Sequence, residues 1–365
     1  MALSGMGVYE VLLTLTGACY LGGVLWLIYG LRQPRRPSGD WLPSVSVVVA
    51  ARNEEETIAA CLGALRAQDY QGPFEAVVVD DRSTDRTALR VGAETWPQLR
   101  LVTAPHDLQF RCPKKSALAA GIEQSRGDLL LLTDADCQPP PDWVSRTVSL
   151  FGPGVGMALG HAFPTPAPSL RQRILALDNL AVGALGAGSA GMGRPLSCTG
   201  RNLAYLRRVY DEAGGFGQIG HLVGGDDVYF MRLVSRTSWT IVVNPAPVAC
   251  GPAPAAWGAA LQQKLRHAAK AGHYRGPALV LGAVVYLFHL LLGLGVAKLF
   301  LGEPSLVFAC VWGAKWLVDV LLVAGYAVRP AERELLRYLP ILELVYIPYI
   351  LFFTLAGRFG WFRWK

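Results

Sequence analysis

Two aspartates close an apolar stretch of this sequence, and their spacing suggests metal chemistry. Asp134 and Asp136 end the run LLLLTDADC, three prolines follow shortly, and no Lys or Arg stands beside them. Because one residue separates the pair, an extended backbone directs both carboxylates to the same face. Two anions so close repel each other, and hard oxygen ligands favour Mg²⁺ or Mn²⁺ over zinc. The pattern predicts a divalent-metal site; a solvated strand end before a proline-rich turn is the alternative.

The composition predicts a membrane protein. Of 365 residues 52% are hydrophobic, and the mean hydropathy is +0.32, more than a soluble core requires. Four apolar segments are long enough to cross a bilayer: 11–29, 277–300, 306–328 and 338–356. Pro340, Glu343 and Pro348 interrupt the last segment and a basic tail follows it, so we expect it either to span or to lie in the interface.

The arginines predict how the chain is oriented. They follow the first and third apolar segments: Arg32, Arg35, Arg36, Arg329, Arg333 and Arg337. Since basic flanks stay in the cytoplasm, we expect the N-terminus outside and the middle of the chain inside. No Lys or Arg precedes the first segment, which indicates a retained anchor rather than a signal peptide. We therefore expect a multi-pass protein of the cell inner (plasma) membrane with a cytoplasmic catalytic domain.

Charge and cysteine content exclude some partners. The net charge is +7, yet no basic stripe with interleaved aromatic residues is present, so we expect anionic lipid headgroups and no nucleic acid as partners. The seven cysteines form no C-x-x-C pair and no Cys/His ligand spacing. We expect reduced thiols, without a zinc site or a disulfide framework.

Between the apolar segments, strand-like and helix-like stretches alternate over a length that suits one α/β domain. The strand-like runs are SVSVVVA, EAVVVDD, LRLVTA and DLLLLTDAD. Continuous Val and Leu runs joined by helices predict a mainly parallel sheet covered on both faces. Ligands bind beyond the carboxyl ends of such strands, where Asp80, Asp81 and the Asp134–Asp136 pair stand. Asn53 is expected to cap the helix after the first strand, with Glu56 completing a capping box.

Seven motifs in order carry a resemblance to a known family. They are VSVVVAARNEEETI, VVVDDRSTDRT, KKSALAAGI, LLLLTDADC, TGRNLAYLRRVYDEAGGF, GGDDVYF and QKLRH. Over residues 44–274 the chain resembles the family 2 inverting glycosyltransferases of the membrane-anchored bacterial type, which have the GT-A fold. The resemblance implies four parts: 1–36 as a transmembrane anchor, 37–256 as a cytoplasmic GT-A (nucleotide-diphospho-sugar transferase) catalytic domain, 257–276 as an amphipathic interfacial helix, and 277–365 as a membrane region with about three hydrophobic segments.

In the family, the first two motifs hold the nucleotide. The resemblance implies that Asp81 faces the base and Asp80 the ribose, with the main-chain turn at Ala51 and Arg52 as the other contact. Glu54 is expected to serve the helix that follows the first strand instead of the nucleotide. Either Lys114 or Lys115 matches the family lysine, although Ala119 stands where asparagine is usual, and either could be a plain surface charge at a helix start.

The fourth motif resembles the family D-x-D, which binds the donor diphosphate through Mg²⁺ or Mn²⁺. Asp136 would be the more direct metal ligand and Asp134 would lie nearer the ribose and donor sugar. Arg201, in the stretch TGRN, resembles the donor-sugar loop, and Trp143 resembles part of the acceptor wall.

The acidic pair in GGDDVYF corresponds to the family's general base. Asp227 matches the second acid, which takes the proton from the acceptor hydroxyl, and Asp226 stands in place of a glutamate. Inversion needs one base and no covalent intermediate, so one carboxylate is enough. The alternative is a pair of capping residues for the following helix, a role we expect Asp226 to fill.

The motif QKLRH stands where polymer-forming members have Q-x-x-R-W. Arg266 would touch the diphosphate and Gln263 the acceptor side, while His267 replaces the tryptophan. A basic amphipathic helix on the lipid headgroups is the alternative. The expected function is transfer of a sugar from a nucleotide-diphosphate sugar, with UDP the expected nucleotide, to a lipid or lipid-linked acceptor. A processive polysaccharide synthase and a non-catalytic nucleotide-sugar binding module are the alternatives.

Overall fold

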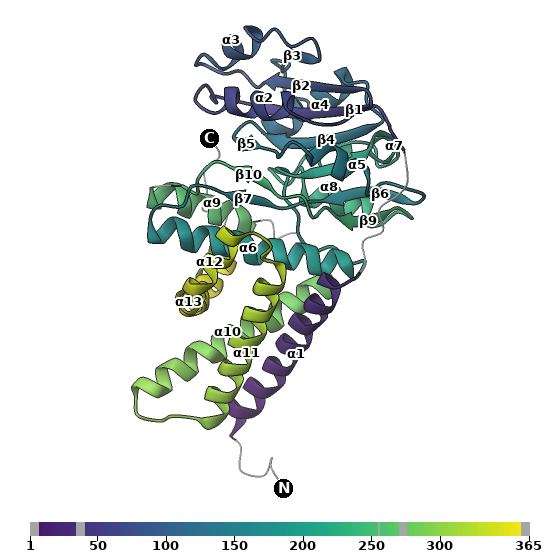
Figure 1. The fold of residues 1–365 in the computed structure, drawn as a ribbon. Coiled ribbons are helices and arrows are strands. Elements are labelled where there is room, and N and C mark those ends of the chain that lie inside the picture. The colour runs from purple at the N-terminus through teal and green to yellow at the C-terminus, as the bar shows by residue number, and fades with distance from the viewer. Residues whose placement is uncertain (1–6, 34–40, 255, 270–275, 359–365) are drawn as a thin grey trace. The chain divides into compact units, whose positions relative to one another are not determined.

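The computed structural model describes residues 7–33, 41–254, 256–269 and 276–358 (Figure 1). The chain forms two compact units, each of which is described by itself. The sheet unit consists of Gly30–Pro166 and Leu185–Gly251, and the membrane unit of Met1–Tyr29, Ala167–Ala184 and Pro252–Lys365. Arg35 and Arg36, on which the expected orientation partly rests, lie outside the described residues.

A seven-stranded sheet forms the centre of the sheet unit, in the order β3-β2-β1-β4-β8-β6-β9. Its strands are β1 (Val45–Ala51), β2 (Phe74–Asp80), β3 (Leu99–Thr103), β4 (Leu129–Asp134), β6 (Val155–Leu159), β8 (Leu203–Leu206) and β9 (Thr240–Val243). Neighbouring strands are parallel except where β8 runs antiparallel between β4 and β6. The expected α/β architecture with a mainly parallel sheet is confirmed.

Helices connect these strands, as the alternating sequence pattern predicts. They are α2 (Ile58–Arg66), α3 (Thr87–Gly92), α4 (Pro113–Gln124), α5 (Trp143–Val148), α7 (Arg207–Glu212), the 3₁₀ turn η1 (Gly217–Ile219) and α8 (Val228–Val234). The valines at the centre of β1 are fully buried, which a sheet covered on both faces requires. Gly121 lets α4 approach this sheet, because a Cβ there would meet Val48 at 2.6 Å and Val79 at 2.7 Å.

The predicted capping box before α2 is wrong. The helix begins at Ile58, with Thr57 at the N-cap position, and Asn53 lies five residues before Ile58 in the left-handed region, with φ of 56°. Its side-chain oxygen accepts a hydrogen bond from the backbone N–H of Thr84 at 2.8 Å. Asn53 therefore ties the loop after β1 to the loop after β2, and Asn tolerates this backbone conformation better than most residues.

A second, three-stranded sheet belongs to the same unit. Its strands are β5 (Cys137–Gln138), β10 (Val248–Cys250) and β7 (Ala162–Pro164), in that order. β10 is antiparallel to β5 and pairs Cys250 with Cys137. Because β5 begins one residue after Asp136, this small sheet fixes the chain just beyond the aspartate pair.

The membrane unit is helical. Its helices are α1 (Val8–Leu31), α6 (Leu170–Gly191), α9 (Trp257–Ala269), α10 (Pro277–Phe300), α11 (Leu306–Tyr326), α12 (Pro330–Leu335), the 3₁₀ turn η3 (Leu336–Tyr338) and α13 (Leu339–Arg358), with the ends of α1 and α6 running into the sheet unit. Five helical stretches among the described residues are long and apolar enough to cross a membrane: Val8–Leu31, Leu170–Gly191, Leu279–Phe300, Leu306–Tyr326 and Pro330–Gly357. The sequence analysis missed the second, because Arg171, Arg173 and Asp178 interrupt it.

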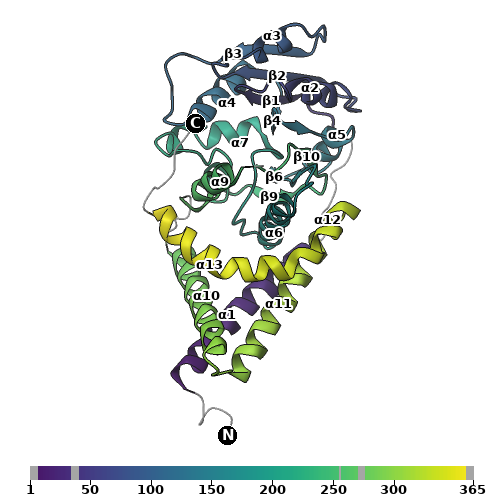
Figure 2. The same cartoon turned by 90° about the vertical axis from the view of Figure 1, so that its left-hand side faces the viewer.

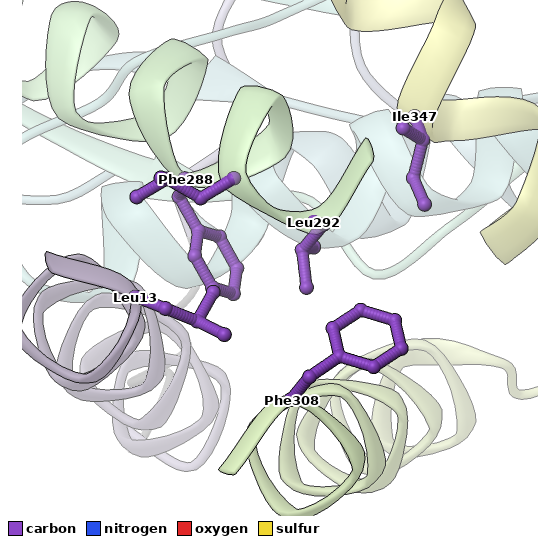
Figure 3. Close-up of a cluster of buried hydrophobic side chains, with 6 residues drawn as sticks. Leu13, Phe288, Leu292, Phe308 and Ile347 are labelled. Carbon is purple, nitrogen blue, oxygen red and sulfur yellow. The ribbon is translucent and has the colours of Figure 1, made fainter. Parts of the chain in front are cut away.

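Figure 3 shows where four of these helices meet. Leu13 of α1, Phe288 and Leu292 of α10, Phe308 of α11 and Ile347 of α13 form one buried apolar cluster. In Figure 2, α13 runs across α10 and α11 instead of alongside them. Length and apolarity allow α13 to span, and both expected courses of this segment, across the bilayer or in the interface, stay predictions.

A polar cluster lies inside the same unit. Lys315 of α11 donates hydrogen bonds to Asp319, at 2.7 Å, and to Glu343 of α13. Tyr20 of α1 donates to both oxygens of Asp319, at 2.9 and 3.0 Å. Charged groups inside an apolar unit need such partners. Glu343, which interrupts the last apolar segment of the sequence, is therefore neutralised by Lys315 of a neighbouring helix.

Candidate active site

Two adjacent loops at the carboxyl ends of β1 and β2 form the first part of the candidate site. The backbone N–H of Asp81 donates to the carbonyl of Ala51 at 2.7 Å. The hydrogen bonding between β1 and β2 therefore continues to the carboxyl ends of both strands. Asp80 and Asp81 are only 8% and 5% exposed. Arg52 is exposed next to Ala51. The structure thus brings together the four residues that were predicted to contact the nucleotide.

The two buried aspartates differ in their partners. The Asp81 carboxylate accepts two hydrogen bonds from the guanidinium of Arg82, at 2.5 and 2.9 Å. Asp80 Oδ2 accepts the backbone N–H of Ser83 at 3.4 Å, whereas its Oδ1 is buried without a hydrogen-bond partner among the described residues. An unsatisfied buried acceptor costs free energy unless a ligand supplies a donor. Asp80 is therefore suited to accept from a hydroxyl group such as those of a ribose.

The aspartate pair is surrounded by cations, contrary to what its sequence neighbours suggest. Lys114 Nζ lies 2.5 Å from Asp134 Oδ1. The guanidinium of Arg201 donates to Asp134 Oδ2 at 3.3 Å and to Asp136 Oδ2 at 3.2 Å. No Lys or Arg is next to the pair in the sequence, but the tertiary fold brings both cations from distant parts of the chain.

These contacts shift protonation equilibria. Burial alone would raise the pKa of Asp134, but the charges of Lys114 and Arg201 outweigh it and hold that pKa below its ordinary value. Burial likewise opposes the charged form of Lys114, yet Asp134 and Asp226 raise the pKa of its ammonium group. Asp134 and Lys114 are consequently both ionised throughout the physiological range.

Arg201 is held in place by the surrounding backbone. Its carbonyl accepts the hydroxyl of Thr133, on β4, at 2.9 Å. The next residue, Asn202, donates to the carbonyls of His161 and Ala246 at 2.9 and 2.8 Å. Trp143 donates its indole N–H to the Asn202 side chain at 2.9 Å and is fully buried. Trp143 therefore supports the loop that carries Arg201, and the prediction that it lines an acceptor wall is wrong.

The two neighbouring lysines point to different partners. Lys114 reaches Asp134, as described above, and its Nζ lies 4.0 Å from Asp226 Oδ2. Lys115 is fully buried and donates to the carbonyls of Ile219 and Leu222, at 2.6 and 2.8 Å. The structure thus distinguishes the two alternatives, since Lys114 belongs to the candidate site and Lys115 to the support of the segment that precedes GGDD.

Asp226 and Asp227 lie at the start of α8. Asp227, not Asp226, is the capping residue, because its Oδ1 accepts the backbone N–H of Val228 at 2.6 Å. The expectation that Asp226 caps this helix is therefore wrong. A Cβ on Gly200 would lie 3.2 Å from Asp226 Oδ2 and 3.8 Å from Asp227 Cβ. The glycine next to Arg201 thus brings the acidic pair close to the cation cluster.

Comparison with known proteins identifies the family. The profile described as glycosyl transferase family group 2 matches residues 129–359, more than half of the chain, and the profile of glycosyl transferase family 2 matches residues 46–173. This chain belongs to glycosyl transferase family 2. The predicted family and fold are confirmed.

Individual relatives of this family 2 chain are distant. An N-acetylglucosaminyltransferase of Mesorhizobium japonicum is 29% identical over 252 residues, which are 64% of this chain and 57% of that protein. An undecaprenyl-phosphate 4-deoxy-4-formamido-L-arabinose transferase of Pectobacterium carotovorum subsp. carotovorum is 33% identical over 118 residues, 32% of this chain and 36% of that protein. The chain thus spans little more than half the length of the rhizobial relative.

A solved structure extends the likeness in fold to nearly the whole chain. The mannosyltransferase of Pyrobaculum calidifontis, solved in complex with GDP-Man and Mn²⁺, superposes with a TM-score of 0.58 at 20% identity and covers 97% of this chain and 98% of its own. At this identity the likeness concerns the fold alone.

The family 2 site has the chemistry for a divalent metal shared with a substrate. Among the described residues, no group of three or more His, Cys, Asp or Glu side chains is placed to hold a metal by itself. Asp136 offers a hard carboxylate whose side chain is 22% exposed, whereas both oxygens of Asp134 already accept from cations. These residues fit Mg²⁺ or Mn²⁺ if phosphate oxygens complete the coordination.

Gln263 and Arg266 lie on α9, in the membrane unit. Lys264, between them in the sequence, pairs with Asp178 of α6, which also accepts the hydroxyl of Tyr346 of α13 at 2.8 Å. Burial lowers the pKa of Arg266 from its ordinary value. The roles predicted for Gln263 and Arg266 in this family 2 protein stay predictions.

Proposed function

We propose that this protein is a membrane-bound inverting glycosyltransferase that moves a sugar from a nucleotide-diphosphate sugar to a lipid or lipid-linked acceptor. The observation that carries the proposal is the cluster of Asp134 and Asp136 with Lys114 and Arg201, next to the acidic pair at α8. It lies at the carboxyl edge of a parallel sheet, where such folds bind nucleotides. Family membership supports the transferase activity.

The cations and carboxylates of the cluster suit a donor diphosphate. In the described structure Lys114 and Arg201 neutralise the aspartate pair. A diphosphate that entered beside them would offer these cations stronger partners, because guanidinium and ammonium groups bind phosphate oxygens well. A metal held by Asp136 would stabilise the negative charge that gathers on the diphosphate as the sugar leaves. We propose UDP as the nucleotide, with its ribose next to Asp80.

The acceptor hydroxyl needs a base on the side opposite the leaving diphosphate. We propose Asp227 as this base, because it matches the second acid of the family motif and lies at the start of α8 near Gly200. Its carboxylate takes the hydroxyl proton while the acceptor oxygen attacks the anomeric carbon, so that one displacement inverts the configuration. Asp226, 4.0 Å from Lys114, would hold that lysine in position.

The lipid acceptor is proposed from the membrane helices. Five long apolar helical stretches support membrane association, and one relative is a transferase whose name contains undecaprenyl phosphate. We propose that the chain is anchored in the inner membrane by residues 1–36 and 277–365, with the catalytic part 37–256 in the cytoplasm and 257–276 at the interface. A reporter enzyme fused after Arg36 that is active only in the periplasm would contradict this orientation.

Release of nucleoside diphosphate from candidate donors tests the function directly. The full chain, purified in detergent, is given UDP- and GDP-sugars with Mn²⁺, with and without a lipid extract. We expect release that depends on the lipid and a labelled lipid product carrying one sugar. A product ladder of many sugars would favour a polysaccharide synthase instead. Donor binding without any release, across all donors and acceptors, would favour a binding module, and transfer to soluble acceptors alone would refute the lipid acceptor.

A further inference from the structure

Two buried cysteines face each other directly beyond the aspartate pair. Cys137 of β5 and Cys250 of β10 are register partners on antiparallel strands, and they are 0% and 3% exposed. The backbone N–H of Gly251 donates to the carbonyl of Asp136 at 2.9 Å, so the cysteines form the adjacent, non-hydrogen-bonded pair. Side chains are closest at such pairs, where Cα atoms lie about 4.5 Å apart, within the range that disulfides span.

Both thiols also touch the candidate site. The Cys137 thiol donates to Asp136 Oδ1 at 3.4 Å. Arg201 donates from Nη1 to Cys250 Sγ at 3.5 Å. Neither thiol is in a disulfide, and the remaining cysteines are free as well. A change in the covalent state of this pair would therefore act on Asp136 and Arg201 at once.

We propose that Cys137 and Cys250 form a reversible disulfide that switches the aspartate site off. The sequence analysis leaves these residues without a role, because they are 113 positions apart and form no motif. The fold alone places them in register, so that the bond can form with little movement of the strands. This proposal goes beyond glycosyl transfer, because the disulfide can be observed without any substrate.

A small peroxide is the oxidant that such buried thiols would admit. One thiolate attacks hydrogen peroxide, which breaks the O–O bond, gives a sulfenic acid and releases the other oxygen as water after protonation. The second sulfur then displaces the sulfenic oxygen, which leaves as a second water. In total, two thiols lose two electrons and two protons, and one peroxide becomes two waters. A dithiol reductant reverses the change by thiol–disulfide exchange.

The disulfide would remove two contacts of the site. Asp136 would lose its thiol donor, and Arg201 would lose a thiol acceptor that helps to hold its guanidinium between the aspartates. We expect glycosyl transfer to fall by about tenfold or more on oxidation, the effect of losing hydrogen bonds to charged groups.

Peptide mapping after peroxide treatment tests the proposal. The full chain in detergent is treated with hydrogen peroxide, alkylated and digested without reductant. We expect mass spectrometry to find the peptides of Cys137 and Cys250 linked, and dithiothreitol to restore both free thiols and activity. If no linked peptides are found, the proposal is overturned. It is also overturned if the linkage forms in an active preparation and the rate of sugar transfer stays unchanged. A preparation without transferase activity still decides whether the bond forms.

Variants separate this pair from other thiols. Cys250→Ala and Cys137→Ala should each abolish the peroxide sensitivity, measured as the ratio of oxidised to reduced activity. The matched control carries Cys19→Ala and Cys310→Ala, which remove the two exposed thiols of α1 and α11. It should remain as sensitive as the natural chain. If the peroxide sensitivity is lost in this control but kept in Cys250→Ala, then the exposed thiols, and not the buried pair, are the oxidised groups. If the buried variants do not fold, the linkage map of the natural chain decides.

Discussion

The guanidinium of Arg201 lies across the two aspartates of the D-x-D motif, with Nε 3.3 Å from Asp134 and Nη2 3.2 Å from Asp136. One planar cation thus holds both carboxylates in the described structure, and a flexible ammonium could not reproduce this fork. We propose that the same group turns to the diphosphate when a donor enters. Arg201 would therefore neutralise the aspartates when no donor is bound and contact the diphosphate when one is.

Replacing Arg201 by lysine should weaken donor use without unfolding the chain. The charge is kept, but the two hydrogen bonds to separate aspartates cannot both be made, so we expect kcat/KM for the donor to fall by about 10- to 100-fold. Steady-state kinetics measure the change. Arg146→Met is the control, because Arg146 of α5 forms an exposed ion pair with Asp142, the residue just before that helix. Equal kinetics for Arg201→Lys and the natural chain would contradict the role.

Sugar transfer should require a divalent metal that Asp136 binds. We expect transfer to stop in EDTA and to recover with Mn²⁺ or Mg²⁺. Both oxygens of Asp134 accept from cations, whereas Asp136 Oδ1 accepts only a thiol among the described contacts, so Asp136 can offer a carboxylate oxygen to these hard ions. Asp136→Asn should abolish turnover and the recovery together, and titration calorimetry with Mn²⁺ and UDP gives a readout that does not depend on activity. Full activity in EDTA would overturn the assignment.

Lys114 and Lys115 are adjacent in the chain, but replacing each of them should have a different effect, one mainly on kinetics and the other mainly on stability. Lys114→Met removes one of the two cations of Asp134, so donor KM and kcat should both suffer, while Arg201 still pairs with Asp134 and limits the loss of stability. Lys115→Met leaves the carbonyls of Ile219 and Leu222 without their donor, and we expect a loss of about 1–3 kcal/mol in stability. Thermal unfolding and kinetics on both variants distinguish the two effects. The reverse pattern would exchange their roles.

Acid should weaken the sheet unit through Asp134. Because its folded pKa is lowered by Lys114 and Arg201, these ion pairs stabilise the fold above the unfolded pKa of about 3.9 and lose their effect as pH falls through the lower, folded value. Unfolding by urea between about pH 6 and pH 3 should therefore show a flatter pH dependence in Asp134→Asn than in the natural chain. Asp142→Asn, at an exposed ion pair, should keep the natural slope.

The sequence predicted the strands and the residues of the site better than their contacts. Continuous Val and Leu runs followed by Asp reveal buried parallel strands and their ends, since both features are local. The contacts of Asp134 with Lys114 and Arg201 join residues 20 and 67 positions away, so no local pattern can show them. The capping prediction at Asn53 was wrong for a similar reason, because its partner, Thr84, lies on the next loop.

The acidic pair at α8 should show which carboxylate accepts the proton. Asp227 caps the helix through Oδ1, and an asparagine can make the same hydrogen bond, so Asp227→Asn should fold normally. An amide cannot accept a proton at physiological pH. We therefore expect kcat to fall by about 10²- to 10⁴-fold with donor affinity nearly unchanged.

The comparison variant is Asp226→Asn. Asp226 lies 4.0 Å from Lys114, so losing its charge should loosen that lysine and weaken donor binding, with a milder loss of kcat. Kinetics and UDP titration on the two variants distinguish the roles, because Asp227→Asn should mainly lower kcat and Asp226→Asn should mainly weaken donor binding. If Asp227→Asn turns over normally, or if its whole defect lies in donor binding while Asp226→Asn loses kcat alone, then Asp226 is the base and Asp227 serves only to cap α8.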